Sequence, residues 1–307
     1  MKFVKPLFWN SKNIISIILF PLSLITLIIN ELKELNSKKK FLIKTICVGN
    51  TYLGGTGKTS LAIEIQTLLK KKFKTVFIKK NYADQLDEIN LLKKQGELIS
   101  KNSREEALHL ASKKKYELAI LDDGLQQKNI DYELKIICFN AKDGFGNNFS
   151  LPAGPLRESI NKIKNYDIAF INGEKKNKDF YLKLKSINKK LQIFEGKYKP
   201  INLKIFNLKK KYLMFCGIGN PHEFEQTLVK NKFLIKEKIV YPDHYKIPNE
   251  ILNKLKLKAQ NESLSIVTTE KDFFRLRKSQ RKNIKFLKIS LKIKDIKKFK
   301  KLLISKL

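Results

Sequence analysis

Residues Leu53 to Ser60, with the sequence LGGTGKTS, lie between a largely apolar run, Ile43–Val48, and a segment from Lys58 to Leu69 whose pattern predicts a helix. A strand, a glycine-rich turn and a helix in this order are typical of a phosphate-binding loop. The N–H groups of such a turn converge on phosphate oxygens, and the helix N-terminus adds its partial positive charge. The alternative is a glycine-rich turn that caps the helix and binds no nucleotide.

Each residue type in such a loop has its own task. The ammonium of Lys58 reaches the β- and γ-phosphates of ATP, and the hydroxyl of Thr59 is a ligand of Mg²⁺. The nucleotide-binding turn itself consists of Gly54, Gly55, Thr56 and Gly57. The strict motif has a further glycine where this chain has Tyr52. We therefore expect ATP and Mg²⁺ as cofactors, bound by a loop that departs from the strict motif at one position.

The composition sets broad limits on fold and partners. A chain of 307 residues is long enough for two domains. Its formal charge of +35 indicates an anionic partner, which includes nucleic acid, anionic lipid and phosphorylated substrates. Lysines are scattered along the whole chain, however, so a drift of neutral surface sites toward Lys explains part of the excess. Three separated cysteines and three histidines without a Cys/His cluster indicate neither disulfides nor structural zinc.

The N-terminal segment Ile14–Ile29 carries no charge and is interrupted by Pro21, with lysines on both sides and Phe8-Trp9 in front of it. It is short for a helix that spans a bilayer, which needs about 20 residues. Flanking basic and aromatic residues favour a segment that lies in the cytoplasmic face of a membrane. A buried core helix and a true span are the alternatives.

Strand-like and helix-like segments alternate along most of the chain, which predicts parallel sheets with helices on both faces. We expect an α/β fold: a P-loop NTPase-like parallel-sheet domain, a smaller α/β domain and an N-terminal membrane-associated helix. The expected boundaries are 1–40 for the N-terminal segment, 41–190 for the P-loop domain, 191–210 for an extended linker and 211–307 for the second domain. Helices are expected at 58–69, 88–99, 104–114, 178–190, 221–229, 249–259 and from 295.

Asp122 and Asp123 end a short apolar run, Glu117–Leu121, that we interpret as a buried strand. This is the position at which P-loop enzymes keep the carboxylate on the Mg²⁺ side. Two adjacent carboxylates repel each other unless a cation or hydrogen-bond donors lie between them, so a metal site is the simpler interpretation. The alternative is a solvated acidic turn before Gly124.

Other residues have two interpretations each on spacing alone. Asp87 is either a general base that takes a proton from an attacking hydroxyl or the N-cap of the following helix. His244, in the loop after the strand expected at 234–240, is either structural or functional. Arg157 either holds a phosphate through its planar guanidinium or forms a surface ion pair.

Taken together, the motifs resemble those of the tetraacyldisaccharide 4′-kinase family, the lipid A 4′-kinases of Gram-negative bacteria. The resemblance covers nearly the whole chain and its motifs occur in the family's order. The motifs are Phe8-Trp9, the loop 54–59, Asp87-Glu88, DDGLQ at 122–126, LPAGPLRE at 151–158, GIGNP at 217–221, PDH at 242–244 and TEKD at 269–272. The family's P-loop similarly lacks the first glycine, which accounts for Tyr52.

The resemblance implies a kinase that moves the γ-phosphoryl of ATP to the 4′-hydroxyl of an acylated glucosamine disaccharide 1-phosphate. It implies two α/β domains joined by a two-stranded linker, at the cytoplasmic face of the inner membrane. Lys58 and Thr59 match the family's phosphate and Mg²⁺ residues, and Asp122 and Asp123 match its acidic pair. Asp87 matches the family's proposed base. The family's base-supporting histidine is matched by His244.

Three positions depart from the family pattern. The segment after the second strand is usually Ser-Arg-Gly-Tyr-Gly and here is Lys79-Lys80-Asn81-Tyr82-Ala83, so a bidentate arginine is replaced by the point charge of Lys80. The usual Gly-Asp-Glu-Pro is Leu86-Asp87-Glu88-Ile89, and Gln127 replaces a histidine. These departures bear on rate and substrate preference more than on the type of reaction.

We therefore expect a monotopic or peripheral lipid kinase, monomeric, whose partners are a lipid A disaccharide 1-phosphate precursor and the anionic inner-membrane surface. The alternative is a membrane-positioned P-loop ATPase that acts as a switch, but the extra lysine of that class would stand at Leu53. A nucleic-acid partner is not expected, because the chain lacks a basic motif interleaved with aromatic residues.

Overall fold

The computed structural model describes residues 6–34, 37–82, 86–173, 177–243 and 245–307, without the side chains of residues 33, 34, 86 and 87. Within the described residues the chain forms two compact units. The larger unit comprises the described residues within 6–81, 92–197 and 291–307, and the smaller one comprises those within 82–91 and 198–290. Each unit has its own sheet and its own hydrophobic core.

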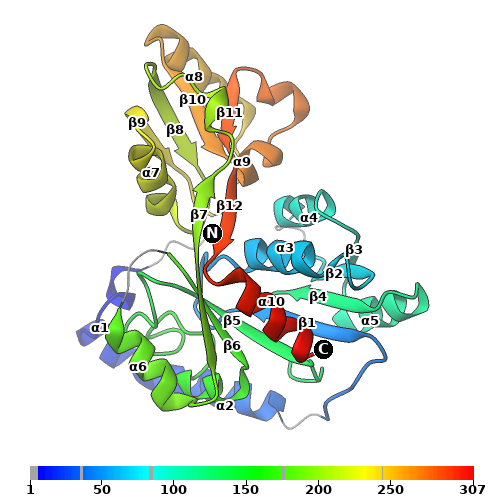
Figure 1. Cartoon of the computed structure of the whole chain (residues 1–307). Coiled ribbons are helices and arrows are strands. Elements are labelled where there is room, and N and C mark those ends of the chain that lie inside the picture. Colours follow the sequence, from blue (N-terminus) through cyan, green and yellow to red (C-terminus); the bar gives the residue numbers. More distant parts are fainter. Residues whose placement is uncertain (1–5, 35–36, 83–85, 174–176, 244) are drawn as a thin grey trace. The chain divides into compact units, whose positions relative to one another are not determined.

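The larger unit is built on an eight-stranded sheet with the order β12-β7-β6-β5-β1-β4-β2-β3 (Figure 1). Its strands are β1 Lys44–Gly49, β2 Thr75–Lys80, β3 Leu98–Lys101, β4 Leu118–Asp122, β5 Leu134–Asn140, β6 Ile168–Asn172, β7 Gln192–Pro200 and β12 Ile289–Ile293. The pairs from β3 through to β7 are parallel. β1 lies between β4 and β5, where the chain order reverses, and ligands of such sheets bind outside the carboxyl ends of the strands at this point.

Helices cover both faces of this sheet, which is why its inner strands are buried on both sides. Besides the N-terminal helices, the larger unit contains α3 Lys58–Leu69, α5 Arg104–Lys113, α6 Lys178–Ile187 and α10 Ile296–Ser305. The core that includes Cys47 and Phe139 also contains residues of α5 and α6. On the opposite face, Phe299 of α10 packs its ring against Phe170 and Phe194 of β6 and β7.

The smaller unit has a four-stranded parallel sheet with the order β11-β10-β8-β9 (Figure 1). The strands are β8 Lys211–Cys216, β9 Leu234–Val240, β10 Ser265–Thr269 and β11 Ile284–Leu287. The helices are α4 Leu86–Lys93, most of which belongs to this unit, α7 Pro221–Lys230, α8 Asn249–Asn261 and α9 Glu270–Arg275. Residues of α7 and α8 contribute to separate hydrophobic cores, each shared with alternate residues of β8.

The chain passes from the larger unit to the smaller one at 197–198 and returns at 290–291. Both crossings lie within strands, β7 and β12, which are neighbours in the large sheet. The linker expected at 191–210 therefore begins as a strand of that sheet. The expected assignment of 211–307 to the second domain is wrong for residues 291–307, because β12 and α10 return to the larger unit.

Two more expectations differ from the structure. The helix expected at 88–99 is α4, which ends at Lys93, and a turn leads from it to the edge strand β3, which begins at Leu98. The N-terminal segment consists of α1 Ile14–Ile18 and α2 Phe20–Glu34, preceded by a 3₁₀ turn at Leu7–Trp9. Other 3₁₀ turns are Ile160–Asn165, Leu203–Ile205 and Lys278–Arg281.

Candidate functional site

The glycine-rich loop runs from the end of β1 to the start of α3, as expected. Gly54 has φ of +134° and Gly57, at the N-cap of α3, has φ of +85°, both of which favour glycine. The amide of Asn50 donates to the carbonyls of Tyr52 and, at 3.2 Å, Gly54. These contacts fix the turn at the start of α3, where the first N–H groups of a helix have no partner within the helix.

Asp122 ends β4 beside this loop and is fully buried. Its Oδ2 accepts a hydrogen bond from the Thr59 hydroxyl at 3.1 Å and lies 2.7 Å from the ammonium of Lys79. Its Oδ1 is buried without a hydrogen-bond partner in the part of the chain that the structure describes. An orphaned carboxylate oxygen in the interior is costly, so this atom indicates a missing cation or donor.

The donor set at this position fits Mg²⁺. In phosphoryl-transfer sites the ion takes one or two protein oxygens and completes its shell with phosphate oxygens and water. The Thr59 hydroxyl and the Asp122 carboxylate supply such a pair. Clusters of three or more His, Cys, Asp or Glu side chains that could hold a metal are absent from the described residues.

Asp123 faces a different set of charges from Asp122. Its carboxylate lies 3.8 Å from the Lys58 ammonium and accepts from Arg157 Nη1 at 3.1 Å. Burial by itself raises the pKa of Asp123, but Lys58, Arg157 and Lys79 together hold that pKa below its ordinary value. Asp123 is therefore an ionised group that holds the P-loop lysine and Arg157 on one side of the site.

The loop 150–157 is paired through its backbone with residues 51–53, which precede the glycine-rich turn. Leu53 N–H donates to the Pro155 carbonyl at 2.8 Å, Arg157 N–H donates to Thr51 at 2.6 Å, and Tyr52 forms a bridge with Leu156. These bonds fix the position of the segment before the glycine-rich turn relative to the loop 150–157. They also place Arg157 beside Asp123. Arg157 is thus part of the site and not a surface ion pair with Glu158.

Asp87 lies in the first turn of α4, and its side chain is outside the described part of the structure. Because α4 begins at Leu86, Asp87 is not the N-cap of this helix. The next residue, Glu88, pairs with Lys271 of α9 at 2.6 Å. This ion pair connects the segment that carries Asp87 to the TEKD motif of the smaller unit.

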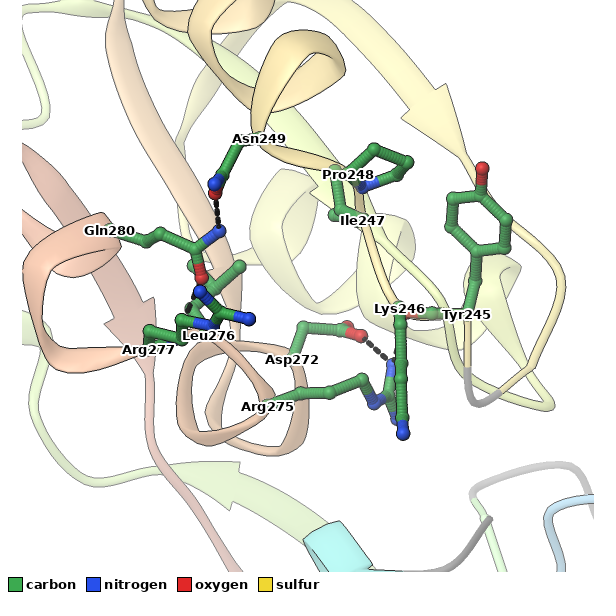
Figure 2. A pocket seen from close by; sticks show the side chains of 10 residues that line it. All are labelled: Tyr245, Lys246, Ile247, Pro248, Asn249, Asp272, Arg275, Leu276, Arg277 and Gln280. Carbon is green, nitrogen blue, oxygen red and sulfur yellow. Dashed lines mark hydrogen bonds and ion pairs between the residues drawn. The ribbon is translucent and has the colours of Figure 1, made fainter.

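His244 lies outside the described residues, so its expected role is not tested by contacts. The chain that follows it lines a pocket of about 250 Å³ in the smaller unit (Figure 2). Figure 2 shows Arg275 directed at Asp272, 2.6 Å away, and the same guanidinium donates to the Gly217 carbonyl at 3.1 Å. Burial raises the pKa of Asp272, although Arg275, Thr269 and the Gly217 N–H favour its ionised form. This network connects the GIGNP and TEKD motifs.

Several residues of the site were not predicted from sequence. Lys79 is 2% exposed and contacts Asp122, whereas the sequence argument gave the charge to Lys80. Asn172 ends β6 and donates to the Thr56 carbonyl, and Gln126 donates to the Asn50 carbonyl at 2.8 Å. Arg104 donates to the Asp123 carbonyl. The signal that would have found Asn172 is a polar residue at the end of a buried strand.

Comparison with known proteins identifies the family of this chain. A family model described as tetraacyldisaccharide-1-P 4′-kinase matches residues 15–307. The tetraacyldisaccharide 4′-kinase of Pelagibacter ubique is 43% identical over 302 residues, which cover 96% of this chain and 95% of the relative. The enzyme of the same name from Rickettsia bellii is 31% identical over 295 residues, 90% of each chain.

Among solved structures, LpxK from Aquifex aeolicus, crystallised in complex with ATP, superposes with a TM-score of 0.72. The match covers 95% of this chain and 99% of that one at 22% identity, which establishes the shared fold. The family model and the relatives extend over nearly all of both units and over the site that joins P-loop, acidic pair and LPAGPLRE loop. The chain belongs to the tetraacyldisaccharide-1-P 4′-kinase family.

Proposed function

We propose that the chain transfers the γ-phosphoryl group of ATP to the 4′-hydroxyl of a tetraacylated glucosamine disaccharide 1-phosphate, in lipid A biosynthesis. The observation that carries this proposal is the meeting of Lys58, Thr59, Asp122, Asp123 and Arg157 beside the glycine-rich turn. Phosphoryl transfer needs little covalent chemistry from the protein and depends on positioning and on neutralising charge. The site supplies both.

Each residue then has a defined role. The turn Gly54–Gly57 and the first N–H groups of α3 bind the phosphates, and Lys58 neutralises charge on the transferred group. Thr59 and Asp122 hold Mg²⁺, while Asp123 orients Lys58 and Arg157. Bound Mg²⁺ supplies the charge that stabilises the phosphate oxygens during transfer.

The acceptor hydroxyl must lose a proton during the reaction, and Asp87 is the proposed base that takes it. The support for this role is the match of Asp87-Glu88 to the family motif and the ion pair that ties Glu88 to Lys271. His244 is proposed to hold the base in its reactive orientation, on the match of Pro242-Asp243-His244 to the family. The roles of Asp87 and His244 both depend on the match of these residues, position by position, to the motifs of the family.

We further propose that the protein acts at the cytoplasmic face of the inner membrane as a monotopic or peripheral monomer. Helices α1 and α2 expose a dense group of large apolar side chains: Ile14, Ile15, Ile17, Ile18, Phe20, Leu22, Leu24, Ile25, Ile28, Ile29 and Leu32. Such a surface is typical of a membrane contact. No helix in the described ranges is long and apolar enough to cross a bilayer.

The proposal is tested by ATP turnover under three conditions: with the lipid acceptor, with nucleic acid and with neither. A kinase consumes ATP in proportion to phosphorylated lipid, and mass spectrometry shows a product heavier by one phosphate. ATP consumption that is independent of the lipid would instead support a membrane-positioned ATPase switch and would overturn the kinase assignment.

A further inference from the structure

Helix α2 is oriented with its polar side toward the protein. Residues Ser23, Thr26 and Asn30 follow the i, i+3, i+7 spacing of one helix face, and they are buried or half-buried. The opposite side is apolar and exposed; Ile25 and Ile28 are 54% and 58% exposed. This arrangement is the reverse of an ordinary surface helix, so the ring contact between Phe20 and Phe149 and the hydrogen bonds of the polar face hold α2 in place.

Hydrogen bonds from this polar face hold the LPAGPLRE loop. The Ser23 hydroxyl donates to the Ser150 carbonyl at 2.8 Å and accepts from Ala153 N–H at 3.2 Å. The Thr26 hydroxyl donates to the Leu151 carbonyl at 2.6 Å. Asn30 donates to the Arg157 carbonyl at 2.9 Å. The loop is therefore fixed at its start, its middle and its end by one face of one helix.

Trp9 extends the contact at the N-terminal side. Its side chain is 2% exposed and its indole N–H donates to the Pro152 carbonyl at 3.0 Å. The sequence suggested that Trp9 is an anchor at the level of the lipid headgroups. The structure instead packs Trp9 into the protein. Its own carbonyl accepts from Asn147 N–H at 3.0 Å, next to the same loop.

The same loop carries the bonds to the P-loop. Pro155 and Arg157 pair with Leu53 and Thr51 through the backbone, and the Arg157 side chain reaches Asp123. A continuous series of hydrogen bonds therefore runs from α2 through residues 150–157 to the phosphate-binding turn.

We propose that Ser23 and Thr26 are positioning residues for phosphoryl transfer: through the loop 150–157, the buried polar face of the membrane-contacting helix holds the P-loop and Arg157 in their reactive arrangement. This inference rests on the proposed roles of the P-loop and Arg157. It assigns to α2 a second task beside membrane contact, since its apolar side faces outward while its polar side supports the site.

The test compares four variants of the full-length protein in detergent with a dispersed lipid acceptor. Ser23→Ala/Thr26→Val removes both hydroxyls at nearly constant shape, Thr26→Val removes one, and Thr26→Ser keeps the hydroxyl. Thr227→Val is the matched control, because the Thr227 hydroxyl donates to the Glu223 carbonyl within its own helix in the smaller unit. Liposome flotation, melting temperature, kcat and KM are measured for each.

Misplacement of catalytic groups by about 1 Å can cost about a hundredfold in rate. We expect kcat of Ser23→Ala/Thr26→Val to fall about tenfold or more, with flotation retained because the apolar side is intact. Thr26→Val should show a smaller loss of kcat that Thr26→Ser does not share. If the double variant does not fold, the kcat of Thr26→Val relative to that of Thr26→Ser decides whether the hydroxyl supports transfer.

A second readout does not depend on lipid phosphorylation. Hydrogen exchange of peptides that contain Leu53 and Arg157 should accelerate in both hydroxyl-deleting variants and remain unchanged in Thr26→Ser and Thr227→Val. If the wild-type protein transfers no phosphoryl group to the lipid, the kinase proposal fails. Hydrogen exchange still tests whether α2 supports the P-loop through residues 150–157. Wild-type kcat together with unchanged exchange around Leu53 in Ser23→Ala/Thr26→Val would overturn the inference.

Discussion

Lys79 and Asp122 form an ion pair in the interior of the large sheet, with Lys79 Nζ 2.7 Å from Asp122 Oδ2 and side chains that are 2% and 0% exposed. The same Oδ2 accepts the Thr59 hydroxyl, whereas Oδ1 has no hydrogen-bond partner among the described residues. The Lys79 ammonium therefore neutralises charge at Oδ2 of the carboxylate that is proposed to hold Mg²⁺. The atom Oδ1 is the one proposed to contact the Mg²⁺ ion.

This pair predicts the behaviour of Lys79→Met. Removal of one partner leaves a buried carboxylate without its counter-charge, which costs about 3–5 kcal/mol in comparable cases. We expect a lower melting temperature in the absence of nucleotide, and a larger rise on addition of Mg²⁺ and ATP than in the wild-type protein. Lys71→Met, at an exposed site, is the control. An equal melting temperature for both variants would contradict a structural role for the pair.

Lys58→Ala tests the P-loop itself. Lys58 lies at the start of α3 with its ammonium near Asp123, outside the hydrophobic core. We expect transfer to the lipid to fall by orders of magnitude, because the proposed task of Lys58 is to neutralise the transferred phosphoryl group. The circular dichroism spectrum should be nearly unchanged, because the side chain lies outside the core. Lys70→Ala, at the exposed end of the same helix, should keep its activity. Near-normal transfer by Lys58→Ala would show that the P-loop assignment is wrong.

The sequence predicts best those elements whose local signals agree with their tertiary setting. The helix expected from Lys58 to Leu69 is α3 residue for residue, because a glycine turn marks its start and a lysine cluster follows its end. The strand β3 was missed, since Leu98–Lys101 continues an apolar pattern that also suits a helix. Gly96, which precedes this strand, was the available signal for a break.

Long-range pairings are harder to predict than local elements. The return of β12 to the edge of the large sheet depends on pairing with β7, about a hundred residues away in sequence, and no local pattern encodes it. The contact between Lys79 and Asp122 was missed for the same reason. Lys79 looks like one more lysine in a basic chain until the neighbouring strands β2 and β4 bring the two side chains together.

Asp87→Asn distinguishes a base from a structural carboxylate. A base acts mainly in the transition state, so we expect kcat to fall strongly while KM for ATP changes little. In the first turn of α4, a carboxylate also interacts with the helix dipole, which contributes only about 0.3–1 kcal/mol. Unchanged kcat with a small loss of stability would therefore assign Asp87 to the helix. Glu106→Gln, which removes a carboxylate from the first turn of α5, is the matched control.

The three cysteines should be unreactive in the folded protein. All are buried, and burial raises the pKa of Cys47 and Cys216 to about 12 and that of Cys138 still higher. At pH 8 a thiol with a pKa of about 12 is ionised to about one part in ten thousand, and the thiolate is the reactive form. A thiol reagent at pH 8 should label the native protein slowly and three thiols after unfolding.

The sign of this effect also predicts the response to alkali. A raised pKa in the folded state means that the protonated thiols stabilise the fold fully below about pH 8.5, and that this contribution falls as the pH rises toward 12. Denaturant unfolding at pH 8 and pH 10 measures it. Rapid labelling of one thiol in the native protein at pH 8 would place that cysteine outside the core.

The exposed side of α2 should determine membrane binding. Full burial of one large aliphatic side chain contributes about 1.5–3 kcal/mol, so loss of two should weaken binding to anionic vesicles by more than tenfold. We expect Ile25→Ser/Ile28→Ser to show this loss in flotation at physiological salt. Leu182→Ser is the matched control, since Leu182 is 68% exposed on α6. High salt should weaken vesicle binding of the wild-type protein less than the two substitutions weaken it at physiological salt. Salt screens the charges of the lysines but does not affect the apolar contact. If flotation of Ile25→Ser/Ile28→Ser equals that of the wild type while high salt releases both, the basic surface and not α2 provides the attachment.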